Sequence, residues 1–97
     1  MSGHVFHPGH SALHGMTVVV ETDGALTYVG RYDREDSEGV HLLDVAVHDA
    51  RSGMAKENYI QRSSKFGVRG EHRQLIVPAH QVARITPLGS WEQARSS

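Results

Sequence analysis

Apolar and polar residues alternate along the first half of the chain in the manner of β-strands. From Met16 to Thr22 every second residue falls on the same face, and the segment contains three consecutive valines, a β-branched type that favours strands. Asp23-Gly24 follows, a dipeptide typical of the tight turns that join antiparallel strands. The pattern predicts a second strand from about Leu26 to Asp33 and a third from Val40 to about His48.

The second of these predicted strands has a glycine in its interior. Gly30 leaves a gap on the face of the sheet, and such a residue usually marks a bend, a bulge or a close approach of two backbones. We therefore expect the sheet to curl at this position. The short charged segment Arg34 to Gly39 is expected to form the turn into the third strand. Three antiparallel strands with a central kink make most of a small barrel.

The second half of the chain contains a predicted helix followed by two short strands. Met54 to Lys65 could form a helix capped by Ser52 and ended by Gly67, with a partly ordered loop as the alternative. Gln74 to Pro78 and Val82 to Pro87 are apolar runs separated by a tight turn, which brings the expected number of strands to five.

The two ends of the chain are expected to be irregular. A short helix is predicted from Gly9 to His14, and residues 1–8 are expected to be flexible. Residues 89–97 are also expected to be flexible unless Trp91 docks on a neighbour. A chain of 97 residues has room for one domain, which we expect to span residues 1–97.

Charge and composition exclude several classes of protein. Ten lysines and arginines are balanced by eleven aspartates and glutamates, so no overall basic field indicates a nucleic-acid or membrane partner. The chain has no cysteine, no basic leader and no apolar run of membrane-spanning length, which predicts a soluble cytoplasmic protein. It also lacks a nucleophile with an evident base and any glycine-rich phosphate motif, so we expect no enzyme activity and no cofactor.

A set of these residues resembles the first motif of the Sm-like (LSm) family. That motif has an apolar residue and a glycine before the first strand, alternating valines, a glycine turn, a glycine in the second strand, an aspartate in the next loop and an apolar third strand. The matching residues here are Leu13, Gly15, Val18, Val20, Gly24, Gly30, Asp36 and Val40 to Leu43. The glycine spacing and the loop after Asp36 are each one residue longer than is usual in the family.

The second motif is closer to the bacterial, RNA-chaperone branch of the family. The segment from Val77 to Ile85 follows the frame of its last two strands, with His80 at the position of the family histidine. The resemblance implies a five-stranded, SH3-like or Sm-like barrel. Residues 50–73 have no counterpart in the compact bacterial members, so they would be a helical or irregular insertion between strands three and four.

The resemblance also implies a function and an assembly. Sm-like proteins form six- or seven-membered rings and hold single-stranded RNA at the inner rim, which implies a homo-oligomer with Asp36 and His80 near the RNA. Pro78 and Ala79, however, stand where bacterial members have an aromatic residue and a lysine. This departure leaves a second reading open, a structural or protein-interaction module with the same barrel and no RNA pocket. Asp36 and His80 would then be ordinary turn residues.

Two further groups of residues could carry chemistry. A basic set interleaved with Tyr59 and Phe66 is typical of a nucleic-acid patch, with a solvated helix face as the alternative. This set consists of Lys56, Arg62, Lys65, Arg69 and Arg73. Four N-terminal histidines at helical spacing, His4, His7, His10 and His14, could bind zinc or nickel. Pro8-Gly9 interrupts that spacing, so we predict no metal site there.

Overall fold

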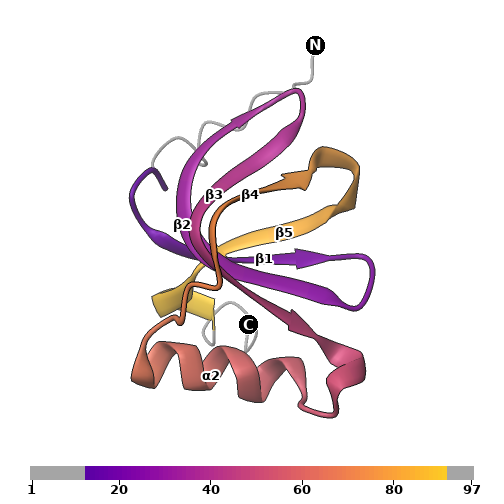
Figure 1. Cartoon of the computed structure of the whole chain (residues 1–97), viewed down its shortest axis with the longest axis vertical. Helices are drawn as coiled ribbons and strands as arrows, with labels where there is room; N and C mark the ends of the chain where they lie inside the picture. The colour runs from indigo at the N-terminus through magenta and orange to yellow at the C-terminus, as the bar shows by residue number, and fades with distance from the viewer. Residues whose placement is uncertain (1–12, 92–97) are drawn as a thin grey trace.

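The computed structural model describes residues 13–91, which form five strands, one α-helix and three short 3₁₀ helices (Figure 1). The strands are β1 (Thr17–Thr22), β2 (Leu26–Asp36), β3 (Gly39–Asp49), β4 (His72–Pro78) and β5 (Val82–Pro87). The helix α2 (Lys56–Phe66) and the 3₁₀ turn η1 (Ala50–Ser52) connect β3 to β4. The turns η2 (Ala79–Gln81) and η3 (Leu88–Ser90) precede and follow β5.

The five strands form one antiparallel sheet in the order β4-β3-β2-β1-β5. The long strands β2 and β3 bend strongly, as Figure 1 shows. The pairing of β2 with β3 shifts register between Val29 and Arg31, at the predicted kink. A Cβ on Gly30 would crowd the backbone of Leu43 and the side chain of Val45, so the bend depends on the missing side chain. The five predicted strands and the bend are confirmed.

The predicted turn from Arg34 to Gly39 is wrong, because most of it is strand. Arg34, Glu35 and Asp36 pair with His41, Val40 and Gly39, and only Ser37-Glu38 remain at the tip. This end of the hairpin is exposed, so its charged side chains stay in water while the backbone continues the ladder. Charge therefore indicated exposure here and not the end of a strand.

Apolar side chains pack on both faces of the sheet. The larger cluster includes Val18, Val20, Tyr28, Tyr32 and Leu42. The smaller cluster lies on the other face and is built from Val19, Val29, Ile60 and Trp91. The strand β1 thus contributes alternate valines to two different cores, which explains why three consecutive valines are all buried.

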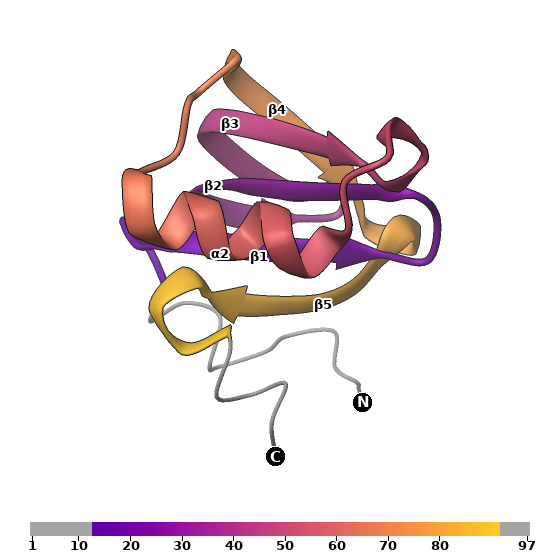
Figure 2. The ribbon, with the colours of Figure 1, turned by 90° about the horizontal axis from the view of Figure 1, so that it is seen from below.

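The helix α2 covers one face of the sheet, as Figure 2 shows. It begins at Lys56, later than predicted, and its N-cap residue Ala55 makes no side-chain capping bond. Ser52 is the last residue of η1, so its predicted role as the cap of α2 is wrong. The predicted stop is confirmed, since Gly67 has a φ of +90° and donates its N–H to the carbonyl of Ser63 at 2.9 Å.

Two side chains of α2 hold the helix to the sheet. Ile60 is 1% exposed in the smaller core. Tyr59 stacks on the buried His48 of β3, with ring centroids 4.6 Å apart. At the other end of the chain, Trp91 is 2% exposed and packs in the same core, so it docks on its own chain and not on a neighbouring molecule. The start of the predicted flexible tail is therefore part of the fold.

The predicted N-terminal helix from Gly9 to His14 falls mostly outside the described residues, as do residues 1–8. Of its positions, Leu13 and His14 lie in a turn with Gly15, whose φ of +84° is the expected left-handed conformation. Among residues 13–91, no helix combines the length and apolar character required to cross a membrane.

Candidate nucleic-acid interface

The candidate residues fall in two separate regions of the molecule. Asp36 lies at the end of β2 and His80 lies in η2, and these segments are neighbours because the N–H of Ala79 donates to the carbonyl of Glu38 at 3.2 Å. The helix α2 carries Arg62 and lies at the opposite end of the long axis (Figure 1). The structure therefore does not bring the predicted nucleic-acid residues into one site.

Asp36 is fully engaged in local hydrogen bonds. Its Oδ1 accepts the backbone N–H of Glu38 at 2.9 Å, and its Oδ2 lies 2.7 Å from the Arg34 guanidinium and 3.0 Å from Nε2 of His41. The bond to His41 is the largest cause that lowers the pKa of Asp36 to about 2, and the Glu38 N–H and Arg34 add to it. We call Arg34, Asp36 and His41 the tip cluster.

The tip cluster and the adjacent Glu38 have the carboxylate and imidazole groups of a metal site, but the Arg34 guanidinium is already bound to one of the carboxylates. Ligand atoms of Asp36, Glu38 and His41 lie within 4.8 Å of one another. The Arg34 guanidinium already occupies the Asp36 carboxylate, and a metal ion would have to displace it. The bond between Asp36 and His41 was not predicted, because it depends on β2 continuing to Asp36, which faces Gly39 and so lies diagonally across from His41.

The base of the same hairpin is also internally bonded. The buried Tyr32 donates its hydroxyl to Oε1 of Glu35 at 3.1 Å. Burial is the main cause that raises the pKa of Tyr32 to about 12, and the charge and hydrogen bond of Glu35 add to it. Glu35 is thereby held against the sheet and does not project as a free carboxylate.

His80 is exposed and lines a groove of about 440 Å³ between η2 and the turn that joins β1 to β2. The backbone N–H of Asp23 donates to the carbonyl of Gln81 at 3.3 Å and closes one side of this groove. Arg51 supplies the cation of the groove, but its guanidinium is held by Asp49 at 2.8 Å. The structure thus places His80 beside an engaged arginine, and Asp36 does not line the groove.

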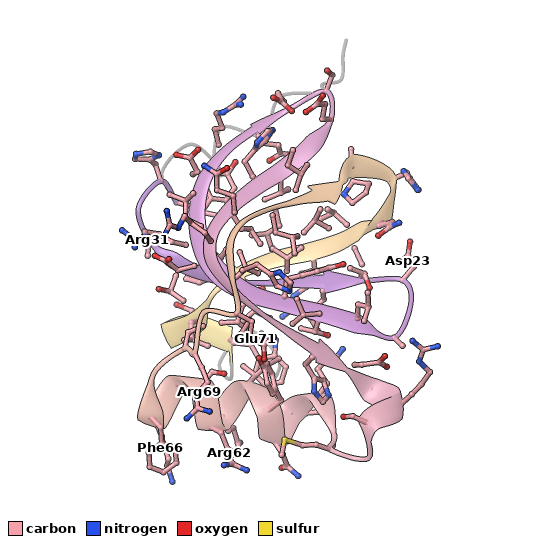
Figure 3. The ribbon with its side chains drawn as sticks, viewed as in Figure 1. Asp23, Arg31, Arg62, Phe66, Arg69 and Glu71 are labelled. Carbon is pink, nitrogen blue, oxygen red and sulfur yellow. The ribbon has the colours of Figure 1, made fainter. Side chains whose placement is uncertain are left out.

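Four side chains on and after α2 form a different kind of surface, which we call the helix patch: Arg62, Lys65, Phe66 and Arg69. Phe66 is 80% exposed, the highest value among the exposed large hydrophobic residues. Figure 3 shows Arg62 and Phe66 projecting from α2 on the side away from the sheet, with Arg69 beside the helix. Two hollows flank Phe66, one lined with Arg62 and Arg69 and the other with Arg62 and Lys65.

The remaining two residues of the predicted basic set lie elsewhere. Lys56 forms an ion pair with Glu21 of β1 at 2.9 Å, so it ties the start of α2 to the sheet. Arg73 lies on the edge strand β4 and lines neither of the hollows beside Phe66. The five residues therefore do not line one surface, because the chain turns between α2 and β4, and their role in nucleic-acid binding stays a prediction.

The cations of the helix patch, like Arg73 of β4, form no ion pair within residues 13–91, whereas other arginines of the described chain do. Arg31, Arg34 and Arg51 lie 2.6 to 2.8 Å from the carboxylates of Asp44, Asp36 and Asp49. Within residues 13–91, no carboxylate forms an ion pair with Arg62, Lys65 or Arg69. The sequence carried this signal, since residues 58–70 contain no aspartate or glutamate.

The strand order and the bent β2–β3 pair define an Sm-like fold. The structure is similar to that of a Pyrococcus abyssii Sm protein, solved in complex with a uridine heptamer, with a TM-score of 0.57 and 16% sequence identity. The match covers 84% of this chain and 99% of the Sm protein. At this identity the similarity shows the fold alone. No family model matches the sequence, and no curated protein matches it.

The resemblance to the Sm-like family is thus confirmed at the level of the fold. A mainly β structure with five antiparallel strands in one sheet and one helix is what the resemblance implied. Placement in the bacterial branch, closure of the sheet into a barrel and the status of residues 50–73 as an insertion stay predictions.

Proposed function

We propose that this protein is an Sm-like ring that binds single-stranded RNA. The observation that carries the proposal is the similarity of the fold to an Sm protein solved with a uridine heptamer. Single-stranded RNA is usually held by aromatic side chains that stack on its bases and by cations that contact its phosphates. The helix patch presents both, an exposed aromatic ring and three cations. The role is one of binding, and no step of catalysis is involved.

The two edges of the sheet support assembly into a ring. The strands β4 and β5 end the strand order, and each pairs along one side only within residues 13–91. Ile76 of β4 is 43% exposed, which is unusual for a large apolar side chain on an open edge. Pairing of β4 in one subunit with β5 in the next would satisfy both edges and cover this side chain.

Light scattering after size-exclusion chromatography tests the assembly. We expect a closed homo-oligomer, a hexamer or a heptamer, built from the 10.7 kDa chain. Ile76→Lys places a charge on the edge and should shift the population to smaller species, whereas Arg73→Lys on the same strand keeps the charge and should not. A wild-type protein that elutes only as a monomer would remove the ring from the proposal.

Fluorescence anisotropy with labelled oligo-U and oligo-A tests the binding. We expect binding that weakens steeply with salt, because contacts to phosphates release counterions. His80→Ala reports on the groove at η2, and Ser90→Ala is a matched surface control in another 3₁₀ turn. If the wild-type ring retains neither oligonucleotide at low salt, the RNA-binding proposal is abandoned.

A protein-interaction module is the second candidate function. The engaged carboxylate of Asp36 favours it, since a side chain that already accepts three hydrogen bonds has little capacity left for a base edge. Affinity purification with and without nuclease separates the two functions. Partners that survive nuclease treatment would support the module, and partners that are lost would support RNA binding.

A further inference from the structure

We propose that the helix patch is a binding site for single-stranded polynucleotide, separate from the hairpin end where the Sm resemblance implies RNA contacts. In this site a base stacks on Phe66, and Arg62, Lys65 and Arg69 contact the phosphates on either side of that base. The inference rests on the proposed function in taking a polynucleotide as the ligand. It goes further in assigning that ligand to α2, a segment outside both matched motifs.

The first step of the argument is the exposure of Phe66. Tyr28, Tyr32 and Trp91 are 2 to 7% exposed in the two cores and Tyr59 is partly buried, whereas Phe66 is 80% exposed. The helix is held to the sheet by Ile60 and Tyr59, so Phe66 is not needed to dock it. An aromatic ring with its face in water is the element on which nucleic-acid bases stack.

The second step is the arrangement of cations around that ring. Arg62 precedes Phe66 by four positions on the same helix, so the two side chains share one face of α2. The hollow on one side of Phe66 measures about 610 Å³ and includes Arg69, and the hollow on the other side measures about 700 Å³ and includes Lys65. Each of the two hollows lined by Phe66 therefore also contains cations that could contact a phosphate beside a stacked base.

The third step is the charge of this surface. Residues 58–70 carry three cations, Arg62, Lys65 and Arg69, and no acidic residue. None of the three is neutralised by a carboxylate within the described part of the chain. The exposed Arg31, Arg34 and Arg51 are each paired with an aspartate. Arg73 of β4 also forms no ion pair within the described residues, but it is a single cation on a different element, whereas the helix patch gathers three such cations around one exposed ring.

A polynucleotide fits this surface better than a lipid bilayer does. An interfacial helix needs a continuous apolar face, but the apolar residues Ile60 and Tyr59 of α2 face the sheet. The exposed positions between the cations are polar, namely Asn58, Gln61 and Ser64. Met54 lines both hollows beside Phe66, and Tyr59 and Val68 line one of them. This small apolar area lies among three cations, an arrangement that matches alternating bases and phosphates better than the acyl chains of a bilayer.

The experiment measures anisotropy of labelled oligo-U and oligo-dT with the full-length chain over a range of salt concentrations. Phe66→Ala should weaken binding roughly tenfold or more through lost stacking, with the salt dependence unchanged. The triple variant Arg62→Ala, Lys65→Ala, Arg69→Ala should weaken binding and reduce the slope of log affinity against log salt by about 2. If the variants lose affinity for oligo-U and oligo-dT equally, the site recognises bases and phosphates without distinguishing RNA from DNA. A larger loss of affinity for oligo-U assigns the site to RNA.

Matched controls separate this site from general loss of charge or of structure. Arg31→Ala removes an exposed arginine that is already paired, and Met16→Ala removes an exposed apolar side chain elsewhere, so neither should change the affinity. Phe66→Trp keeps an aromatic face and should retain binding. Circular dichroism melting of each variant verifies that α2 is still folded.

Two results would overturn the inference and distinguish it from the proposed function. If the helix-patch variants bind oligonucleotides like the wild type while His80→Ala does not, the site on α2 is excluded and RNA binding stands. If wild type binds no oligonucleotide but binds phosphatidylserine vesicles or polyglutamate through Phe66, both the inference and the RNA-binding proposal fall. Loss of binding in Phe66→Ala with recovery in Phe66→Trp supports the inference.

Discussion

The tip cluster and the helix patch are both exposed and charged, yet their charges are used in opposite ways. At the tip cluster, Asp36 accepts hydrogen bonds from Arg34 and from the backbone of Glu38, and it shares another with His41. At the helix patch, Arg62 and Lys65 have no carboxylate partner within the described residues. A cluster whose groups bond to one another is part of the fold, whereas a group of like charges beside an exposed ring is available to a ligand.

The two surfaces also depend on different supports. The tip cluster is carried by two paired strands that run beyond the core, and it is fixed by the close approach of Gly39 to β4. The helix patch is carried by a helix that is held to the sheet by contacts of Ile60, Tyr59 and Trp91 and by the ion pair of Lys56. Substitutions at these supports should therefore separate the two regions.

The largest loss of stability is expected from a substitution at the contacts that hold α2, and with it the helix patch, to the sheet. Ile60→Ala removes a side chain that is 1% exposed and leaves a cavity between α2 and the sheet, which should reduce the free energy of unfolding by about 2–5 kcal/mol. Urea unfolding measures this change. Phe66→Ala is the matched control on the same helix, and its effect should stay within about 0.5 kcal/mol. Equal losses for the two variants would contradict the division of α2 into a buried and an open face.

The next largest loss of stability is expected from a substitution at Gly39, whose close approach to β4 holds the hairpin that carries the tip cluster. Gly39 has a φ of +143°, and a Cβ at this position would collide with the carbonyl oxygen of Val77. Gly39→Ala should therefore cost about 1–3 kcal/mol of stability, measured by thermal unfolding. Gly24→Ala, in an open turn where a Cβ would meet no other atom within 4 Å, should cost much less. If both variants are equally stable, the hairpin end is more adaptable than its backbone geometry indicates.

A smaller effect should distinguish paired from unpaired cations on α2 itself. Lys56 is paired with Glu21, whose side chain is only 13% exposed, so Lys56→Ala should cost about 0.5–1 kcal/mol. Arg62→Ala removes a cation without a carboxylate partner in the described chain and should change the stability by less than that, while it weakens oligonucleotide binding. The paired measurements are urea unfolding and anisotropy. A greater loss of stability for Arg62→Ala would show that Arg62 is part of the fold.

The smallest effect concerns the pH dependence of the tip cluster. Because the pKa of Asp36 falls from 3.8 to about 2 on folding, its contribution to stability is present above pH 3.8 and is lost as the pH falls toward 2. Asp36→Asn should therefore melt at a lower temperature than wild type near neutral pH, and the difference should disappear toward pH 2. Asp23→Asn, at an exposed turn residue, is the control and should melt like wild type at each pH. A difference between Asp36→Asn and wild type that persists at pH 2 would exclude this origin.

The elements of the fold were predictable where local pattern and tertiary environment agree. The alternation from Met16 to Thr22 and the glycine at position 30 led to the correct strands and the correct bend. The extent of the β2–β3 hairpin was not predictable from charge, because exposed charged residues such as Arg34 and Asp36 occur both in turns and in strands that project into water. Trp91 was expected in a flexible tail unless it docked on a neighbour, since nothing local to it indicates the pocket that α2 and the sheet create.

The candidate site was predictable in composition but not in geometry. The basic residues of the second half were identified together, yet Lys56 is used in an ion pair and Arg73 lies on a different element. Whether a cation forms an ion pair depends on whether the fold brings a carboxylate near it, and tertiary contacts decide this. The absence of acidic residues from 58 to 70 was the one local signal that pointed to Arg62 and its neighbours.

The position of Trp91 gives this protein a built-in optical probe. It is the sole tryptophan in the sequence, and it lies in the core that α2 shares with Val19 and Val29. Its emission maximum should shift to longer wavelength whenever α2 separates from the sheet, even while the strands remain paired. Intrinsic fluorescence and far-ultraviolet dichroism recorded on one sample can thus distinguish a local opening of the helix from unfolding of the whole chain, without any added label.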